Sequence, residues 1–183
     1  MGVQTVFKVF IMRNFFILFA TFCGIFLFLE INAQDNNLEN GFCIQANQER
    51  KEVYLTDINE DQSNRSPRDS RNIPINLSAI DVHFKKERNE MEKSIFSEDE
   101  IIQLRKYRIV ATIYINSKTK EIGAVSFLFR DVNNNDIKIV DTRKFAEYRE
   151  MLKSQITVQT LEFEREIKEH GYISQSFRVF YEK

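Results

Sequence analysis

Cysteine, proline and glycine are all scarce in this chain of 183 residues, which contains two, two and five of them. The three glycines beyond residue 33, Gly41, Gly123 and Gly171, are too far apart for a phosphate-binding loop or a dinucleotide fingerprint, which need clustered glycines. The H-E-x-x-H, C-x-x-C and G-x-S-x-G motifs of zinc proteases, redox proteins and hydrolases are absent from the sequence. These absences predict a chain without a cofactor.

An excess of charge of one sign is also absent. Removing Lys8, Arg13 and Glu30, which lie in the first 33 residues, from the 26 basic and 27 acidic side chains leaves 24 and 26. The resulting net charge of −2, with histidine neutral, creates no strong field toward nucleic acid or an anionic membrane. The composition therefore predicts no nucleic-acid partner.

The longest apolar stretch is residues 15–29, which follows two basic residues. As a helix it would extend about 22 Å, short of the roughly 30 Å hydrocarbon core of a bilayer. A basic start, a short apolar run and a small residue at the cleavage position are typical of a signal peptide. We predict a signal peptide at 1–33, cleavage between Ala33 and Gln34, and export to the periplasm or the medium. An uncleaved inner-membrane anchor is the alternative, because Ile31 is a tolerated rather than a preferred residue before the cut.

Cleavage there removes Cys23 and leaves Cys43 as the only cysteine, which excludes an intrachain disulfide. The bulky Phe22 before Cys23 argues against a lipoprotein signal, which requires a small residue at that position. Cys43 lies between two apolar residues, so we expect a small buried side chain, with a reactive or intermolecular thiol as the alternative. Met12 begins a second complete signal-like start, so the true first residue is Met1 or Met12.

The clearest structural pattern lies at 107–130, where apolar and polar residues alternate on both sides of the sequence NSKTK. This alternation predicts a β-hairpin, and apolar residues on its second face favour a central position in a sheet. The C-terminal alternation predicts a last strand at 172–181. We therefore expect an α+β domain at 75–183, mainly an antiparallel sheet packed against one or two helices. An N-terminal extension with a polar loop precedes it at 34–74.

Helix start signals follow on both sides of the hairpin. Ser97 with Glu100 three residues later forms a capping box. Thr142 is expected to cap a second helix over residues 143–154. The apolar stripe of this second helix consists of Phe145, Tyr148 and Leu152. We expect this stripe to pack on the sheet.

Two further segments have weaker patterns. Residues 85–96 predict a helix with a solvated charged face, which includes Arg88 and Glu92 at i,i+4 spacing. Residues 155–170 are ambiguous, because β-branched side chains in the first half resist a helix. We favour a helix in the second half, ending at Gly171.

Asp131, Asn133, Asn135 and Asp136 resemble the start of a calcium-binding loop, whose first three ligand positions they match. The pattern then departs at the sixth position, where Asp136 replaces the usual glycine. It departs again at the twelfth, where Thr142 replaces a bidentate glutamate. We therefore favour a turn stabilised by Asn and Asp side chains over a calcium site.

His83 and His170 are the only histidines. His83 alternates with apolar residues in a predicted strand and should point to solvent, and His170 should lie at the C-terminal end of a helix. Neither is accompanied by an evident set of metal ligands in the sequence. Together with the many carboxylates, they leave open an exported hydrolase acting on glycan or peptide, with a histidine as proton carrier.

Strands at 107–116 and 122–130, a helix and a last strand near 173–181 follow a β-β-α-β order. With the phrase IYINSKTKEIGAVSF at 113–127, this order resembles the carboxy-terminal domain of TonB. The resemblance implies binding of a periplasmic partner by strand addition. A predicted signal peptide before a small mixed domain also resembles the uncharacterised small secreted proteins of Bacteroides-type bacteria.

The function that this sequence favours is a non-enzymatic interaction domain in the periplasm or at the cell surface. An exposed sheet edge or an aromatic face would engage an unknown protein partner. The membrane would be contacted only through an uncleaved signal segment. The carboxylate-dependent hydrolase is the alternative, and no catalytic residue is assigned.

Overall fold

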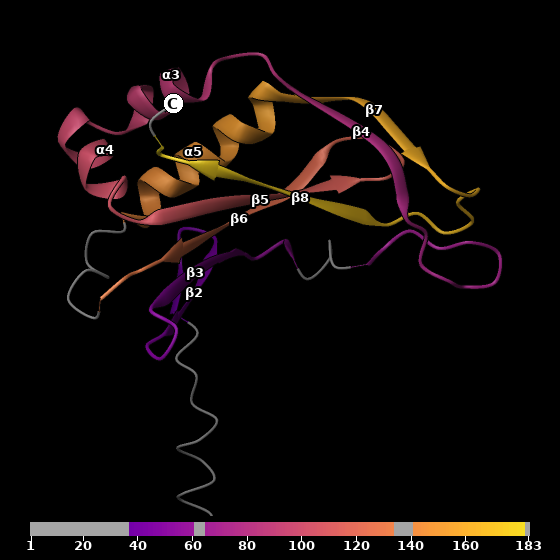
Figure 1. Cartoon of the computed structure of the whole chain (residues 1–183), viewed down its shortest axis with the longest axis horizontal. Coiled ribbons are helices and arrows are strands. Elements are labelled where there is room, and N and C mark those ends of the chain that lie inside the picture. The colour runs from indigo at the N-terminus through magenta and orange to yellow at the C-terminus, as the bar shows by residue number, and fades with distance from the viewer. Residues whose placement is uncertain (1–36, 61–64, 134–140, 182–183) are drawn as a thin grey trace, which may run out of the picture. The chain divides into compact units, whose positions relative to one another are not determined.

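The computed structural model describes residues 37–60, 65–133 and 141–181 (Figure 1). These residues form strands β1 (Asn37–Glu39), β2 (Phe42–Asn47), β3 (Glu52–Asp57), β4 (Leu77–Phe84), β5 (Arg108–Asn116), β6 (Ile122–Arg130), β7 (Ile156–Phe163) and β8 (Tyr172–Val179), and helices α3 (Arg88–Ile95), α4 (Glu98–Leu104) and α5 (Thr142–Gln155). None of the helices in this part of the chain is long and apolar enough to cross a membrane. The predicted signal peptide, with Ala33 and Gln34, lies outside the described residues, so export stays a prediction.

The strands form two antiparallel sheets, which confirms the α+β prediction. The larger sheet has the order β1-β2-β3-β6-β5-β8, and the smaller one pairs β4 with β7. The hairpin predicted at 107–130 is β5 and β6, and it lies inside the larger sheet as expected. The last strand predicted at 172–181 is β8, which pairs with the other side of β5.

The N-terminal strands continue this larger sheet. β2 and β3 form a hairpin, and Val53 and Leu55 of β3 lie opposite Phe129 and Phe127 of β6. The segment at 34–74 therefore contributes β1, β2 and β3 to the same sheet as the hairpin.

One face of the larger sheet packs against the helices and forms one side of the hydrophobic core. Alternate residues of β5 on this face are fully buried, namely Ile109, Ala111, Ile113 and Ile115. Figure 1 shows α3, α4 and α5 on one side of β5, β6 and β8. The Phe145 ring of α5 lies at the centre, 5.0 Å from Phe127, 5.1 Å from Phe129 and 5.2 Å from Phe96 between ring centroids. Burial of such rings is a large favourable contribution to the free energy of folding.

The small β4–β7 sheet packs against this core through one face. Ile80, Val82 and Phe84 are partly buried against it, whereas His83 between them is exposed, as alternation predicted. The Phe84 ring meets Phe177 of β8 at 5.2 Å in an edge-to-face contact. The smaller sheet is thereby tied to the last strand of the larger one.

The two predicted helix starts have different outcomes. The capping box of α4 is confirmed, since Ser97 Oγ accepts from the Glu100 backbone N–H and Glu100 Oε2 accepts from Ser97 N–H at 2.8 Å. The cap predicted at Thr142 is wrong, because Asp141 Oδ1 accepts from Arg143 N–H and Thr142 is the first helical residue. Thr142 is itself buried. The stripe of Phe145, Tyr148 and Leu152 is buried as predicted.

The solvated face predicted for residues 85–96 is wrong at Glu92. This side chain is only 2% exposed, and its Oε1 accepts hydrogen bonds from Phe180 N–H at 3.0 Å and from the Tyr148 hydroxyl at 3.4 Å. An i,i+4 pair indicates neighbouring side chains on one helical face but not which face packs inward. Glu92 instead joins α3 to the end of β8.

The helix predicted in the second half of 155–170 is also wrong. The segment forms β7, which pairs with β4 from Ile156 to Phe163. Its β-branched residues favour a strand, and pairing with β4 extends that strand through the Leu-Glu-Phe sequence. Gly171 therefore does not end a helix, and a different contact explains why glycine is required at this position. A Cβ on Gly171 would lie 1.9 Å from the Arg65 carbonyl oxygen, so only glycine fits there.

Candidate functional site

The outer edge of β8 is one of the two edges of the larger sheet, and β1 forms the other. Tyr172 N–H donates to the Arg65 carbonyl at 2.7 Å, and the Arg178 carbonyl accepts from Arg88 Nη1 at 2.7 Å. Because N–H and C=O of one residue point the same way in an antiparallel strand, the even-numbered residues direct these groups away from β5. Within the described residues, the N–H and C=O of Ser174 and Ser176 have no hydrogen-bond partner. Both side chains are exposed.

The N-terminal end of this edge is closed by residues 65–68. Arg68 N–H donates to the Glu169 carbonyl at 2.9 Å, and Glu169 N–H donates back at 3.0 Å. Gly171 permits the close approach of Arg65 that this pairing requires. An added strand on the β8 edge therefore has to stop before Tyr172.

The C-terminal end is closed by a turn of the chain into the core. Phe180 has a positive φ of 52° and is fully buried, and its N–H is held by Glu92. Burial raises the pKa of Glu92 above its ordinary value of 4.5, although the hydrogen bonds from Phe180 and Tyr148 oppose the rise. Burial likewise raises the pKa of Tyr148 above 10. The open segment, residues 174–178, is thus fixed at its N-terminal end by hydrogen bonds to residues 65–68 and at its C-terminal end by the buried Phe180.

Arg88 covers the last carbonyl of the open segment. Its guanidinium carbon lies 5.5 Å from the Phe84 ring centroid, 5.7 Å from Phe177 and 4.8 Å from Tyr181. Besides the bond to the Arg178 carbonyl, its Nη2 donates to the Tyr181 hydroxyl. We call the three rings, Phe84, Phe177 and Tyr181, the ring cluster. Each ring attracts a cation through its electron-rich face.

The second face of the larger sheet carries the aromatic side chains that the sequence offered as another contact surface. Tyr54 donates to Glu52 Oε2 at 2.6 Å, and this bond raises the pKa of Tyr54 above 10. Burial and a hydrogen bond to Glu60 raise the pKa of Tyr114 in the same direction, and Ser126 donates to the same carboxylate. These hydroxyls are already engaged, unlike the backbone groups of the β8 edge.

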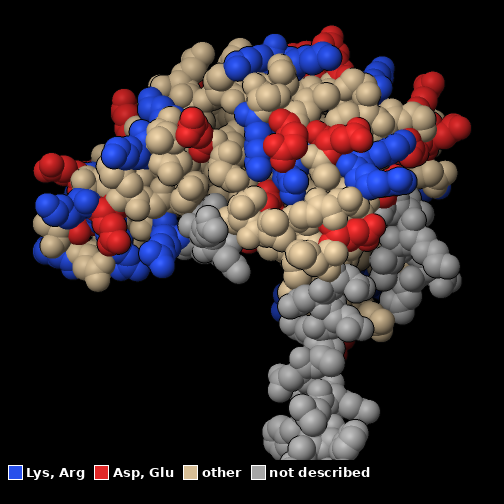
Figure 2. All heavy atoms as spheres, turned by 180° about the vertical axis from the view of Figure 1, so that it is seen from behind, with Lys and Arg blue, Asp and Glu red and all other residues tan. Residues whose placement is uncertain are grey.

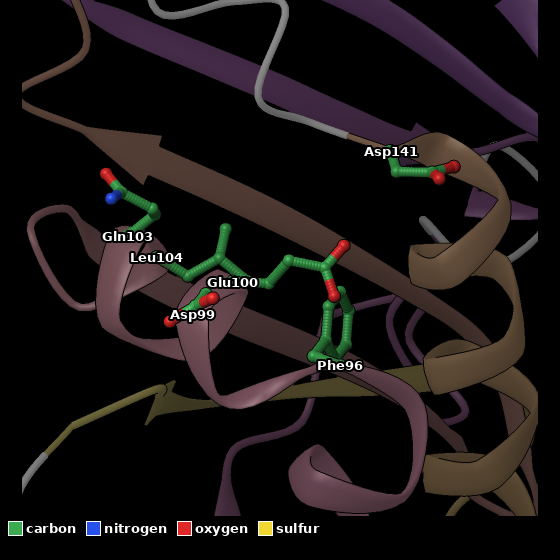
Figure 3. Close-up of a pocket in the computed structure, with 6 residues that line it drawn as sticks. All are labelled: Phe96, Asp99, Glu100, Gln103, Leu104 and Asp141. Carbon is green, nitrogen blue, oxygen red and sulfur yellow. The ribbon is translucent and has the colours of Figure 1, made fainter.

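A hollow of about 150 Å³ beside α4 holds three carboxylates (Figure 3). Figure 3 shows Glu100 extended beside the Phe96 ring and Asp141 at the start of α5. Hydrogen bonds from Lys144 at 2.6 Å, and then from Ser97, lower the pKa of Glu100 to about 2. Burial opposes a decrease for Asp141, but hydrogen bonds from Arg143 outweigh it and lower its pKa too. Neither carboxyl holds a proton near pH 7, as the general acid of a glycosidase must.

The calcium-loop residues lie at the limit of the described chain. Asp131 Oδ2 accepts from Arg108 Nε at 3.0 Å, whereas Asn135 and Asp136 lie outside the described residues. Across residues 37–60, 65–133 and 141–181, no three metal-ligating side chains of the His, Cys, Asp or Glu type come together. The loop with Asp131, Asn133, Asn135 and Asp136 stays a prediction.

The sequence singled out His170, and the structure brings it to Ser117. His170 Nδ1 lies 3.1 Å from Ser117 Oγ, which also accepts from Gly171 N–H at 3.0 Å. The Ser117 side chain is buried, and its own N–H donates to the Gly171 carbonyl. This pair joins the β5–β6 turn to the start of β8. The dipole role predicted for His170 is wrong, because β7 and an irregular segment, rather than the end of a helix, come directly before it.

Cys43 and the residues of the β8 edge illustrate what the sequence patterns missed. Cys43 in β2 is half-buried rather than buried. In the sequence, the spacing of Arg88 and Glu92 indicated a surface ion pair. The structure instead places Arg88 beside three rings, which come from β4, from β8 and from the residues that follow β8. The alternating Ser174 and Ser176 gave the only sequence signal, since small polar residues on a strand are typical of an exposed position.

Charges on the visible surface are mixed. Figure 2 shows Lys and Arg side chains interspersed with Asp and Glu over the face that it presents. That face carries no broad field of one sign, in line with the balanced composition.

Comparisons with known proteins identify the fold alone. No family model matches the chain, and no curated protein matches it. A solved structure of a DUF5043 family protein from Bacteroides uniformis is similar, with a TM-score of 0.51 and 17% sequence identity. The match covers 78% of this chain and 88% of that one. The chain therefore shares its fold with a protein of a Bacteroides family of unknown function.

Proposed function

We propose that this protein is an exported, non-enzymatic binding domain that captures an extended polypeptide segment by strand addition along β8. The observation that carries the proposal is the pair of outward-directed residues Ser174 and Ser176, whose backbone groups have no partner in the described part of the chain. An incoming strand satisfies such groups with main-chain hydrogen bonds, which provide affinity for many sequences.

The closed ends of the edge set the size of the captured segment. Arg65 blocks pairing at Tyr172, and the turn at Phe180 ends the strand. The space between them accommodates about five residues of an added strand, a length at which side-chain contacts have to supplement the backbone bonds. The short edge also limits uncontrolled association between copies of the chain.

The resemblance to the TonB carboxy-terminal domain supports the proposal through topology. The order β5, β6, α5 and β8 follows the β-β-α-β pattern, with β7 inserted before the last strand, and β8 lies next to β5. Export rests on the predicted signal peptide at 1–33. Mass spectrometry of the purified mature protein tests it, with Gln34 as the expected first residue and an intact residue 1 or 12 as the contrary result.

The hydrolase alternative is less well supported, because two of the three carboxyls that line the hollow at α4, Glu100 and Asp141, are held ionised by basic neighbours. Within the described residues, the carboxyl whose pKa is raised is Glu92, and it is buried in the core. We therefore favour binding over catalysis.

The test uses Ser174→Pro with Ser174→Ala as its matched control. Proline removes an N–H that points away from β5, so the native sheet keeps its hydrogen bonds, whereas alanine retains the N–H. Random peptides displayed on phage are selected on the wild-type protein and then measured on both variants. We expect binding to survive in Ser174→Ala and to be lost in Ser174→Pro, with slowed amide exchange at Ser176 in the complex. Equal binding by both variants would refute strand addition at this edge.

A further inference from the structure

Arg88 sits in the ring cluster as an internal ligand. The three rings come from β4, β8 and the residue two positions after β8, and they surround one guanidinium group at 4.8 to 5.7 Å. Phe84 and Phe177 meet at 90°, which leaves an electron-rich face available to the cation. The occupant itself shows which chemistry this site binds, namely a planar cation.

The same side chain controls access to the open edge. Arg88 Nη1 donates to the Arg178 carbonyl, which is the last outward-directed acceptor of residues 174–178. A strand added along this edge brings its own residue opposite Arg178, where the Arg88 guanidinium now lies. The strand can gain its final contacts only by sharing this carbonyl with Arg88 or by displacing the side chain.

Charge decides what can replace Arg88. The buried Glu92 lies one helical turn away on α3, and the positive charge of Arg88 favours the ionised form of its carboxyl. If Arg88 left without a substitute, the buried Glu92 would keep only the weaker favourable field of Arg105. Arg88 is also the first residue of α3, where a positive charge opposes the helix dipole, and this reduces the cost of moving it.

We infer that the polypeptide captured on β8 carries an arginine that takes the place of Arg88 among Phe84, Phe177 and Tyr181. This inference rests on the proposed strand addition and specifies its partner. Backbone pairing at Ser174 and Ser176 holds the segment, and its arginine restores the cation opposite Glu92. In the free protein Arg88 occupies the position that this arginine takes, so it competes with the arginine and lowers the affinity for segments that carry one.

The test compares Arg88→Gln with the wild-type protein. The probes are short synthetic peptides of alternating threonine and alanine that carry one arginine at each position in turn, and a matched set with glutamine in its place. Removing the internal competitor should tighten binding of the best arginine peptide about tenfold, as expected for a partly buried cation among aromatic rings. The glutamine peptides should bind Arg88→Gln no more tightly than wild type.

Two outcomes would overturn the inference. An equal gain for arginine and glutamine peptides would leave strand addition intact and show that the ring cluster does not select a basic residue. If neither set shifts the Ser174 and Ser176 amide signals of folded Arg88→Gln, the inference fails, and the phage selection on the wild-type protein judges strand addition separately.

A second measurement covers the case in which Arg88→Gln does not fold. In the wild-type protein, the Nε–H signal of Arg88 should move when the arginine peptide is added, because the side chain leaves the rings. The glutamine peptide should leave that signal in place. A signal that stays fixed at saturation with the arginine peptide would exclude displacement.

Discussion

Phe180, which belongs to the aromatic core under α5, and the exposed outer edge of β8 lie only a few residues apart in the chain, yet their surroundings are opposite. Phe180 is fully buried and contacts Phe96, Phe145 and Tyr148 through its ring. Ser176, four positions earlier, is exposed, and its backbone groups face outward from the sheet. The core side chains are packed against one another, whereas the backbone groups of the edge can still form hydrogen bonds with an added strand.

This difference indicates that the aromatic core stabilises the fold, whereas the β8 edge is available for binding. The ring contacts around Phe145 hold the sheet and helices together without help from the β8 edge. We expect substitutions at the exposed edge residues Ser174 and Ser176 to be tolerated, because their side chains lie outside the core. The following predictions test that separation, starting with the largest expected effect.

Replacing Phe145 by alanine should cause the greatest loss of stability. Its ring is fully buried and contacts four other rings, so truncation leaves a cavity that the sheet cannot close. We expect a decrease of about 3–5 kcal/mol in the free energy of unfolding, measured by urea denaturation. Ile102→Ala is the apolar control, because Ile102 is 50% exposed and should lose less than about 1 kcal/mol. Similar losses for both would contradict the central role of the ring contacts.

Gly171→Ala should break the closed end of the β8 edge. The new Cβ would meet the Arg65 carbonyl, a backbone group that cannot move independently of its segment. We expect a loss of about 1–3 kcal/mol. We also expect faster amide exchange at Tyr172, whose N–H is bonded to Arg65.

Gly123→Ala is the matched control for this substitution. Its Cβ would meet the Tyr172 ring at 2.7 Å, and a side chain can rotate away. A larger loss for Gly123→Ala than for Gly171→Ala would show that the 65–68 segment is not what closes the edge.

The free energy of unfolding should depend on pH differently at a buried carboxyl, Glu92, and at a surface carboxyl, Glu100. Glu92 has a raised pKa in the folded state, so its stabilising contribution is complete below 4.5 and is lost as the pH rises through the folded pKa. Glu100 has a pKa lowered to about 2, so its contribution is present above 4.5 and is lost as the pH falls toward 2.

We therefore expect Glu100→Gln to flatten the loss of stability between pH 4.5 and 2. Glu92→Gln should leave that slope unchanged and instead remove the loss of stability that the wild-type protein shows as the pH rises above 4.5. The Glu100 effect should stay below about 1 kcal/mol, because its side chain is 39% exposed and screened by solvent. Denaturation midpoints measured on both sides of pH 4.5, from about 2 to about 8, give both slopes. Identical profiles for the two variants would contradict the assigned environments.

The smallest effect on stability is expected at the edge itself. Ser174→Pro should change the free energy of unfolding by less than about 1 kcal/mol relative to Ser174→Ala, since its N–H is not part of the native sheet. Thermal unfolding of the two variants provides the measurement. A much larger loss in the proline variant would mean that the Ser174 N–H already has a partner in the folded chain.

Sequence patterns predicted correctly the strands and helices that are determined by interactions between residues close together in the chain. Alternation at 107–130 identified β5 and β6, and the Ser97 and Glu100 pair identified the start of α4. The pattern failed at β7, because pairing with β4, distant in sequence, decided between helix and strand. It failed again at Glu92, where helical spacing indicated a neighbour on the same face but not what covers that face.

The candidate site was still less accessible to sequence analysis. The β8 edge is exposed because β8 is the outermost strand of the sheet, which the sequence pattern does not show. The residues that bound this edge, Arg65 and Arg88, come from segments far from β8 in the sequence. Ser174 and Ser176 indicated exposure only.

The sequence by itself determined the α+β class, the central hairpin, the buried stripe of α5 and the balance of charge, because these depend on the order and polarity of neighbouring residues. The tertiary structure alone decided that β8 lies at an edge, that Glu92 is buried and that Arg88 fills a cluster of rings. Each of these depends on contacts between residues far apart in the chain, and such contacts are set by packing of the whole domain.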